Sequence, residues 1–183
     1  MRTFIAIDIP VNEELKTAML DIKQSLSTSK INWVDFSTLH LTIVFLGDTQ
    51  NSVIQKIQTD FKNRISDFGT FQLKVANVGY FGPKASPTVI WVGIEQSEHL
   101  IELHKVINDI VLQHKIQHDF RAFKPHITIG RIKQLNDTNI VNDLSRKYRN
   151  KEFQTVLCDK VIMYQSTLTP KGAIYKPLFE QNL

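Results

Sequence analysis

Residues 123–131 read FKPHITIGR and residues 39–45 read LHLTIVF, so one chain carries the pattern His-x-Thr followed by apolar residues twice. In a β-strand, side chains two positions apart point to the same face. The His and the Thr of each copy therefore share one face, and the apolar residues between them face the other way. The repeat predicts two equivalent strands, each with an apolar face for a core and a polar pair that needs an explanation.

A helix is expected after each of these strands. Apolar residues recur at helical spacing behind each copy, at Val53, Ile54, Ile57, Phe61 and Ile65 and again at Ile140, Val141, Leu144 and Tyr148. The strand-helix unit is thus itself repeated. We expect an α+β fold with two lobes related by approximate two-fold symmetry.

The rest of the chain predicts further elements of the same kinds. Expected strands are 3–8, 71–78, 89–94, about 154–165 and 173–179, and expected helices follow Asn12 as an N-cap and cover 100–111. The segment GYFGPKASP is expected to be a loop or hairpin connection. Short connections favour largely antiparallel sheets. No stretch is typical of a long linker, so we expect a single domain over residues 1–183.

Composition limits the class of protein. The chain has 42% hydrophobic and 22% charged residues, as globular proteins do, and its net charge of +4 permits a phosphate-bearing partner without requiring one. Cys158 is the only cysteine and lies in the apolar run VLCDKVIMY, which predicts a buried thiol and no intramolecular disulfide. Asp8 and Pro10 interrupt the first apolar run, so neither a signal peptide nor a membrane span is expected. These features favour a soluble cytoplasmic protein.

The residue types of the repeat suit chemistry on phosphate. Imidazole has an unperturbed pKa of about 6.5, so near neutral pH one histidine can accept a proton while another donates one. Two such groups on opposite sides of a phosphorus atom can run an in-line displacement without a metal. Threonine hydroxyls can donate to phosphate oxygens, and the guanidinium of Arg131 can stabilise the developing charge.

Two points stay open at the level of the pattern. Arg131 lies five positions after His126, so a regular strand would turn it to the opposite face. A bulge at Gly130 would redirect it; otherwise Arg131 is a solvated strand end. In the same way, His40 and His126 could be half-buried strand residues that neighbouring groups hydrogen-bond.

The two motifs, HLTI and HITI, resemble those of the two-histidine (2H) phosphoesterase superfamily, and within it the RNA 2',3'-cyclic phosphodiesterase family, also labelled 2'-5' RNA ligase. The similarity spans nearly the whole chain, through RTFIAIDIP, INWVDFSTLHLTIVFLGD, VGYFGPKASPTVIWVGI, FRAFKPHITIGR and YQSTLTPKGAIYKPL. The resemblance implies a bilobal α+β fold with largely antiparallel sheets, whose two pseudo-symmetric lobes flank a central cleft.

The resemblance also implies an activity and its residues. RNA ends or nucleotides bearing a 2',3'-cyclic phosphate would be opened to a 2'-phosphomonoester without a metal. We expect no other cofactor and a monomer. His40 would be the proton donor to the leaving 3' oxygen, and His126 the proton acceptor that activates water. Thr42 and Thr128 match the motif threonines that hold phosphate oxygens, and Arg131 matches the basic residue after the second motif. The reverse reaction would join RNA ends in a 2'-5' bond.

Three alternatives compete with this interpretation. Similar folds act on other cyclic nucleotides such as ADP-ribose 1'',2''-cyclic phosphate. His114 and His118 could share a helix face and bind a metal, although QHKIQH lacks the adjacent Glu of a zinc protease helix. A non-catalytic RNA-binding module would use a set of aromatic and basic residues, namely Tyr80, Phe81, Phe123, Lys84, Arg121 and Lys124.

Overall fold

The computed structural model describes residues 1–116, 122–169 and 172–183. Within these ranges the elements are β1 (Arg2–Asp8), α1 (Glu13–Ser25), β2 (Lys30–Trp33), the short 3-10 helix η1 (Phe36–Thr38), β3 (His40–Asp48), α2 (Asn51–Arg64), β4 (Phe71–Phe81), β5 (Val89–Ile94), α3 (Glu98–Gln113), β6 (His126–Gln134), α4 (Thr138–Lys147), β7 (Glu152–Cys158), β8 (Lys160–Thr169) and β9 (Gly172–Asn182).

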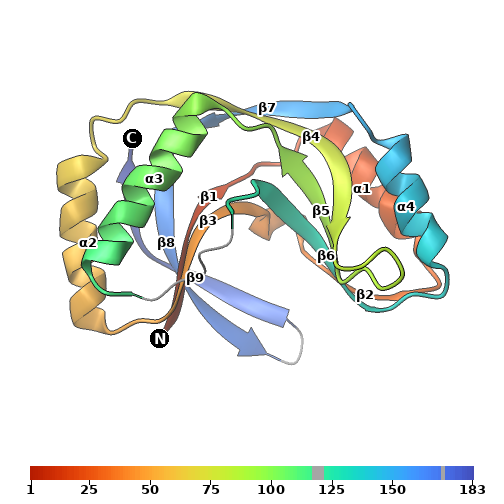
Figure 1. Ribbon diagram of the computed structural model, residues 1–183, viewed down its shortest axis with the longest axis horizontal. Coiled ribbons are helices and arrows are strands. Elements are labelled where there is room, and N and C mark those ends of the chain that lie inside the picture. The colour runs from red at the N-terminus through yellow and green to blue at the C-terminus, as the bar shows by residue number, and fades with distance from the viewer. Residues whose placement is uncertain (117–121, 170–171) are drawn as a thin grey trace.

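All described strands join one antiparallel sheet, in the order β7-β4-β5-β6-β3-β1-β8-β9, with β2 paired to β6 (Figure 1). β3 and β6 meet through a single residue pair, Leu41 with Ile127. This junction divides the sheet into a first half (β3, β1, β8 and β9) and a second half (β6, β5, β4 and β7, with β2). In each half the strand that carries a His-x-Thr motif, β3 or β6, lies at the junction and pairs on its outer side with a strand that precedes it in the chain, β1 or β5. The expected α+β fold with two pseudo-symmetric antiparallel halves is confirmed.

The chain crosses repeatedly between the two halves. Helices α2 and α3 contact β9 and β3 of the first half, whereas α1 and α4 contact β7 and β4 of the second half (Figure 1). α1 follows β1 along the chain yet covers the opposite half, and β8 leaves the second half to pair with β1. Neither half is therefore a continuous segment of the sequence.

The helices form for the reasons that the sequence predicts. The side chain of Asn12 caps α1 by accepting a hydrogen bond of 2.8 Å from the backbone N–H of Leu15. Leu15, Met19 and Ile22, which recur at helical spacing, are completely buried against the sheet. The expected N-cap and apolar face are thus confirmed, and the equivalent apolar faces of the other three helices are buried in the same core.

Two expected strands have other bounds in the structure, and one strand was not predicted. β4 continues to Phe81, so the first part of the expected GYFGPKASP loop is strand; a bulge at Asn77, with φ of 66°, lets its pairing with β5 resume up to Val89. The strand expected over 154–165 is two strands, because the extended structure is interrupted at Asp159. β7 and β8, on either side of it, pair in different halves. β2 was not predicted, since its four residues carry little pattern of their own.

Cys158 lies in the core with no exposed surface. Burial and the neighbouring Asp159 raise the pKa of its thiol to about 12, so the sulfur stays protonated and unreactive. The prediction of a buried structural cysteine is confirmed.

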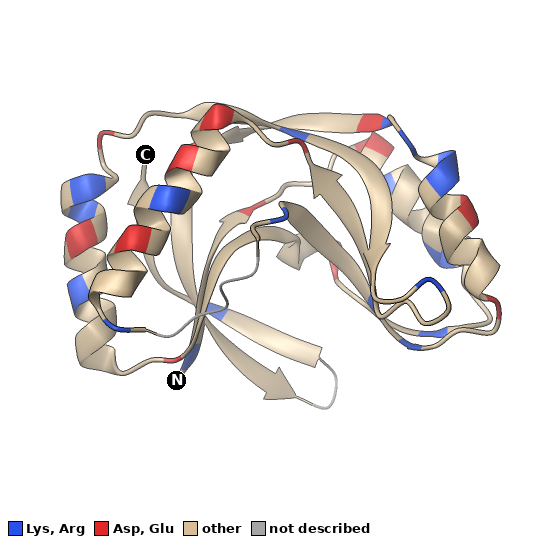
Figure 2. Ribbon diagram, viewed as in Figure 1, with Lys and Arg blue, Asp and Glu red and all other residues tan. Residues whose placement is uncertain are grey.

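Charged side chains are mixed in sign over the molecule. Figure 2 shows Lys and Arg beside Asp and Glu along the helices, whereas the central strands carry few charges. In the described part of the chain, no helix has the length and apolar character to cross a bilayer.

Candidate active site

The two histidines come together at the junction of the halves. Leu41 and Ile127, which form the junction pair, have no exposed surface. In an antiparallel pair the residues before Leu41 and after Ile127 lie opposite each other, so His40 is opposite Thr128. In the same way Thr42 is opposite His126. All four polar side chains therefore lie on one side of the sheet, which we call the histidine face. His40 and His126 each keep a minor fraction of their surface exposed there.

The same backbone bond orients both imidazoles. Nδ1 of His40 lies 2.8 Å from the carbonyl oxygen of Thr38, and Nδ1 of His126 lies 2.6 Å from the carbonyl oxygen of Lys124. A carbonyl oxygen can only accept, so Nδ1 donates and the neutral ring carries its lone pair on Nε2. Among the described residues neither Nε2 has a hydrogen-bond partner, which leaves both available for proton transfer.

Aromatic rings hold each imidazole from the side. The ring of His40 contacts Phe4 at 5.1 Å and Tyr175 at 5.2 Å between centroids. The ring of His126 contacts Phe81 at 4.7 Å and lies 6.5 Å from Trp91. Each histidine is thus fixed by its backbone bond at one nitrogen and by packing around the ring.

A bulge brings Arg131 to the histidine face. Along the β5–β6 ladder, Trp91 pairs with Thr128 but Ile90 pairs with Gly130, so Ile129 is an extra residue in β6. The extra residue reverses the alternation, and Arg131 points to the same side as Thr128. Of the two alternatives left open by the sequence, the structure has the bulge, at Ile129 and not at the neighbouring Gly130.

The first half contains the same irregularity. Ile5 pairs with Val44 and Ala6 with Thr42, so Ile43 is an extra residue of β3 and Phe45 turns to the histidine face. Phe45 lies five positions after His40, as Arg131 does after His126, and half of its surface is exposed (50%). The repeat therefore extends beyond His-x-Thr, but an aromatic ring in one half replaces a cation in the other. Sequence reasoning missed Phe45, although the equal offset was visible.

The surroundings lower the pKa of both histidines. Burial is the main cause at His40, partly offset by the bond to the Thr38 carbonyl and by the carboxylate of Asp8, while Arg131 and His126 lower its pKa further. Burial is also the main cause at His126, where the Lys124 carbonyl raises the pKa and Arg131 lowers it. The positive charge of Arg131 thus acts on both rings.

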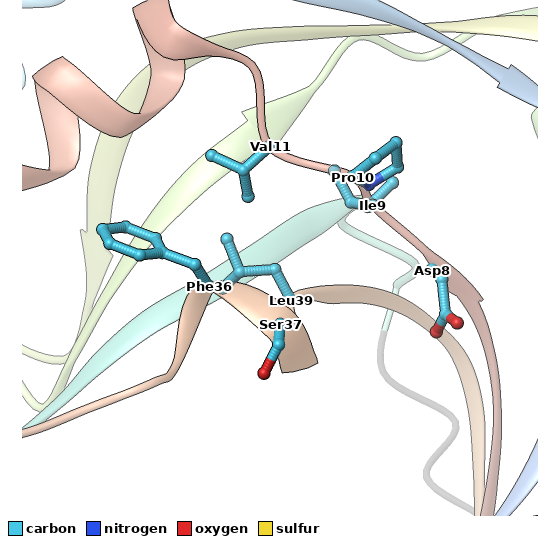
Figure 3. Close-up of a pocket in the computed structure, with 7 residues that line it drawn as sticks. All are labelled: Asp8, Ile9, Pro10, Val11, Phe36, Ser37 and Leu39. Carbon is cyan, nitrogen blue, oxygen red and sulfur yellow. The ribbon is translucent and has the colours of Figure 1, made fainter.

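Asp8 is a further charged group beside the site. It is the register partner of His40 in the β1–β3 ladder, and the hydroxyl of Tyr164 donates to its two oxygens at 2.8 and 2.9 Å. Asp8 also lines a hollow of about 420 Å³ whose other walls are largely apolar. Figure 3 shows Asp8 at one end of the lining residues, away from Val11, Phe36 and Leu39. Sequence reasoning did not assign Asp8 to the site, because only the register places it next to His40.

Of the two histidines of the metal alternative, the structure describes His114. Nε2 of His114, the C-cap of α3, lies 2.6 Å from a carboxylate oxygen of Asp60, a hydrogen bond that links the end of α3 to α2. His118 lies outside the described residues. Within the ranges that the structure describes, no group of three or more His, Cys, Asp or Glu could hold an ion.

The aromatic residues of the binding alternative are partly buried and contact other residues of the protein. The hydroxyl of Tyr80 donates to Asn142 at 2.8 Å, and Phe123 stacks on His104 at 4.1 Å with the rings nearly parallel. Phe81 packs against His126 and Trp91. Lys84 and Lys124 are exposed, and Arg121 lies outside the described residues.

Comparison with known proteins finds a family model and relatives that match most of the chain. A model of the 2'-5' RNA ligase superfamily matches residues 14–168. Proteins named RNA 2',3'-cyclic phosphodiesterase are similar over nearly the whole chain: that of Thermotoga maritima is 37% identical, covering 98% of this chain and 94% of the relative, and that of Archaeoglobus fulgidus is 32% identical, covering 97% and 98%.

Solved structures share the architecture. The TT0787 protein of Thermus thermophilus superimposes with a TM-score of 0.79 at 23% identity, covering 100% of this chain and 98% of that one. LigT of E. coli, crystallised with 3'-AMP, superimposes with a TM-score of 0.72 at 20% identity, covering 100% and 96%. Together with the two His-x-Thr motifs on one face of the sheet, these similarities establish that the chain belongs to the 2'-5' RNA ligase superfamily.

Proposed function

We propose that this chain hydrolyses RNA-terminal 2',3'-cyclic phosphates to 2'-phosphomonoesters without a metal or other cofactor, with His40 as proton donor and His126 as proton acceptor. The observation that carries the proposal is the shared Nδ1–H bond to a backbone carbonyl, which leaves Nε2 of both rings for proton transfer. Relatives more than 30% identical over nearly the whole chain, named RNA 2',3'-cyclic phosphodiesterase, support the choice of substrate.

In the proposed reaction a bound water loses a proton to Nε2 of His126 as its oxygen bonds to phosphorus. The bond from phosphorus to the 3' oxygen breaks, and Nε2 of His40 gives that oxygen a proton. The 2' ester bond remains, so the product is a 2'-phosphomonoester. His126 ends charged and His40 neutral, and exchange of protons with water restores the starting states.

Three residues hold the phosphate in this proposal. The hydroxyls of Thr42 and Thr128 lie on the histidine face and donate to non-bridging oxygens, while the guanidinium of Arg131 stabilises the charge that builds up on them. When a 5'-hydroxyl replaces the water, the same groups form a 2'-5' bond by microscopic reversibility. Both histidines come from one chain, so a monomer has all the groups that the reaction needs. The proposed enzyme is a monomer that acts in the cytoplasm.

The test uses purified protein with a chelator present. Wild type is incubated with a nucleoside 2',3'-cyclic phosphate and with an oligonucleotide that ends in one, and the 2' and 3' monophosphates are separated. His40→Ala and His126→Ala are compared with His99→Ala, which removes an exposed imidazole at the start of α3. We expect only the 2' product from wild type and from the His99 variant, and a loss of turnover by ~10²-fold or more in the other two.

Other outcomes separate the alternatives. Turnover that requires a metal ion would contradict the mechanism. If the wild type leaves 2',3'-cyclic phosphates intact but cleaves ADP-ribose 1'',2''-cyclic phosphate, that compound is the better candidate for the substrate. An inactive wild type whose RNA affinity survives His40→Ala would instead favour a binding module.

A further inference from the structure

The two halves provide equivalent histidines, so something must decide which one carries the proton before the substrate binds. Both rings have the same backbone bond, the same threonine two positions later and an aromatic neighbour at each side. A site with exact two-fold symmetry would leave acid and base interchangeable. The direction of proton transfer therefore has to come from groups in which the halves differ.

The clearest difference lies at the register partner of each histidine. In the first half His40 is opposite Asp8, and in the second half His126 is opposite Gly93. A side chain at Gly93 would begin 2.7 Å from the backbone carbonyl oxygen of Ala76, so this position has no room even for a methyl group. A carboxylate can therefore stand beside His40 but not at the equivalent place beside His126.

Asp8 is also held in place. Its two oxygens accept from the hydroxyl of Tyr164, whose ring stacks on Phe4 at 5.4 Å, and Phe4 in turn contacts the ring of His40. Burial raises the pKa of Tyr164, and the bond to Asp8 raises it further, so its hydroxyl remains a donor at neutral pH. The stacked rings of Tyr164 and Phe4 thus position both the Asp8 carboxylate and the His40 imidazole.

The other charges around His40 are positive or already paired. From β6, Arg131 and His126 face it, and both disfavour a second positive charge. From β8 and β9 the titratable neighbours are Tyr164, whose hydroxyl donates to Asp8, and Tyr175, whose ring contacts that of His40. Lys160 is close enough to Asp8 for their charges to interact, but its ammonium group is paired with Glu180 at 2.7 Å. Among the described residues, Asp8 is the negative charge that, together with the Thr38 carbonyl, partly offsets the effect of burial and of Arg131 on this ring.

We propose that Asp8, held by Tyr164, is a positioning residue that favours the protonated form of His40 and so determines which of the two histidines is the acid. This inference rests on the proposed function for its catalytic meaning. The effect of Asp8 on the protonation of His40, however, is a property of the free protein and can be measured without substrate.

The test is an NMR titration of the full chain with labelled histidine rings, in which His40→Ala assigns the His40 signal. Asp8→Asn should lower the titration midpoint of His40 by about half a pH unit to one unit, as expected for one charge roughly 5 Å away near the protein surface. Asp8→Glu keeps the charge and should restore most of the shift. Asp48→Asn makes the same change at the far end of the β1–β3 ladder and should leave the midpoint unchanged. Asp8→Ser provides a second neutral variant if Asp8→Asn folds poorly.

Activity gives an independent reading. In the Asp8→Asn variant the alkaline limb of the kcat/KM profile, which reports the acid, should move down by the same amount while the acidic limb stays. A His40 midpoint that is equal in wild type, Asp8→Asn and Asp8→Ser would overturn the inference even if the enzyme is active. A shifted midpoint in a protein that cleaves no cyclic phosphate would sustain the charge effect and refute the proposed function instead.

Discussion

Removing the side chain of Ile127 tests whether the single pair between the halves fixes the site. Ile127 is completely buried and pairs with Leu41 on one side and Val92 on the other. Ile127→Ala deletes three carbons, worth about 2.4 kcal/mol at about 0.8 kcal/mol each, and the cavity raises the loss of unfolding free energy to about 3–4 kcal/mol. For a chain of this size the melting temperature should fall by about 10 °C.

The same change should reduce catalysis, since Ile127 lies between His126 and Thr128. Thermal unfolding followed by circular dichroism gives the stability, and kcat is measured well below the lowered melting temperature. Leu41→Ala, at the equivalent place in the first half, should behave alike. Leu157→Ala on β7, where the side chain is 58% exposed, should cost less than about 0.5 kcal/mol.

Two results would refute the reasoning. Equal melting temperatures for the Ile127 and Leu157 variants would mean that the junction contributes little to stability. A destabilised Ile127 variant with an unchanged kcat in its folded state would mean that the junction does not align the histidines.

Three further predictions concern single groups. Arg131→Ala should lower kcat/KM by about 10²-fold and Arg131→Lys by less, because lysine keeps the charge but not the planar fork; equal losses in steady-state assays would contradict a role for that fork. The pKa values of His40 and His126 are lower in the folded protein than the value of about 6.5 expected when unfolded, so the unfolded chain binds more protons and stability should fall as the pH drops from 7 through the folded values. Urea unfolding between pH 5 and 7.5 should show this slope, and a slope that is unchanged in both alanine variants would exclude these two groups as its cause. Cys158 should react with a thiol reagent only after denaturation, and rapid labelling of the native protein would contradict its burial.

The parts of the fold that sequence predicts are those with a local pattern. The alternation around His40 and His126 gives two strands, and the helical spacing behind Asn12 gives α1, because burial of one face is recorded in neighbouring residues. The break at Asp159 could not be predicted, since the strands on either side differ only in their distant partners. Pairing over a long range leaves little trace in a short segment.

The candidate site shows the same limit. The repeat identifies the residue types, but which of them meet depends on register. That Asp8 stands opposite His40, and that the extra residue is Ile129, are facts about how two strands align. A shift of one residue would reverse every face, so only the assembled sheet decides them.

The crossing of the chain between the halves also sets an order of completion. During synthesis the second half has all its strands once residue 158 has emerged, and His126 then lies within a full set of neighbours. β1 can pair with β3 early, but its other edge stays unpaired until β8 is made, and Asp8 lacks its bond to Tyr164, which is made 156 residues later. A nascent chain, or a fragment that ends before β8, therefore holds His126 in a half with all its strands, while the half of His40 still lacks two of its strands.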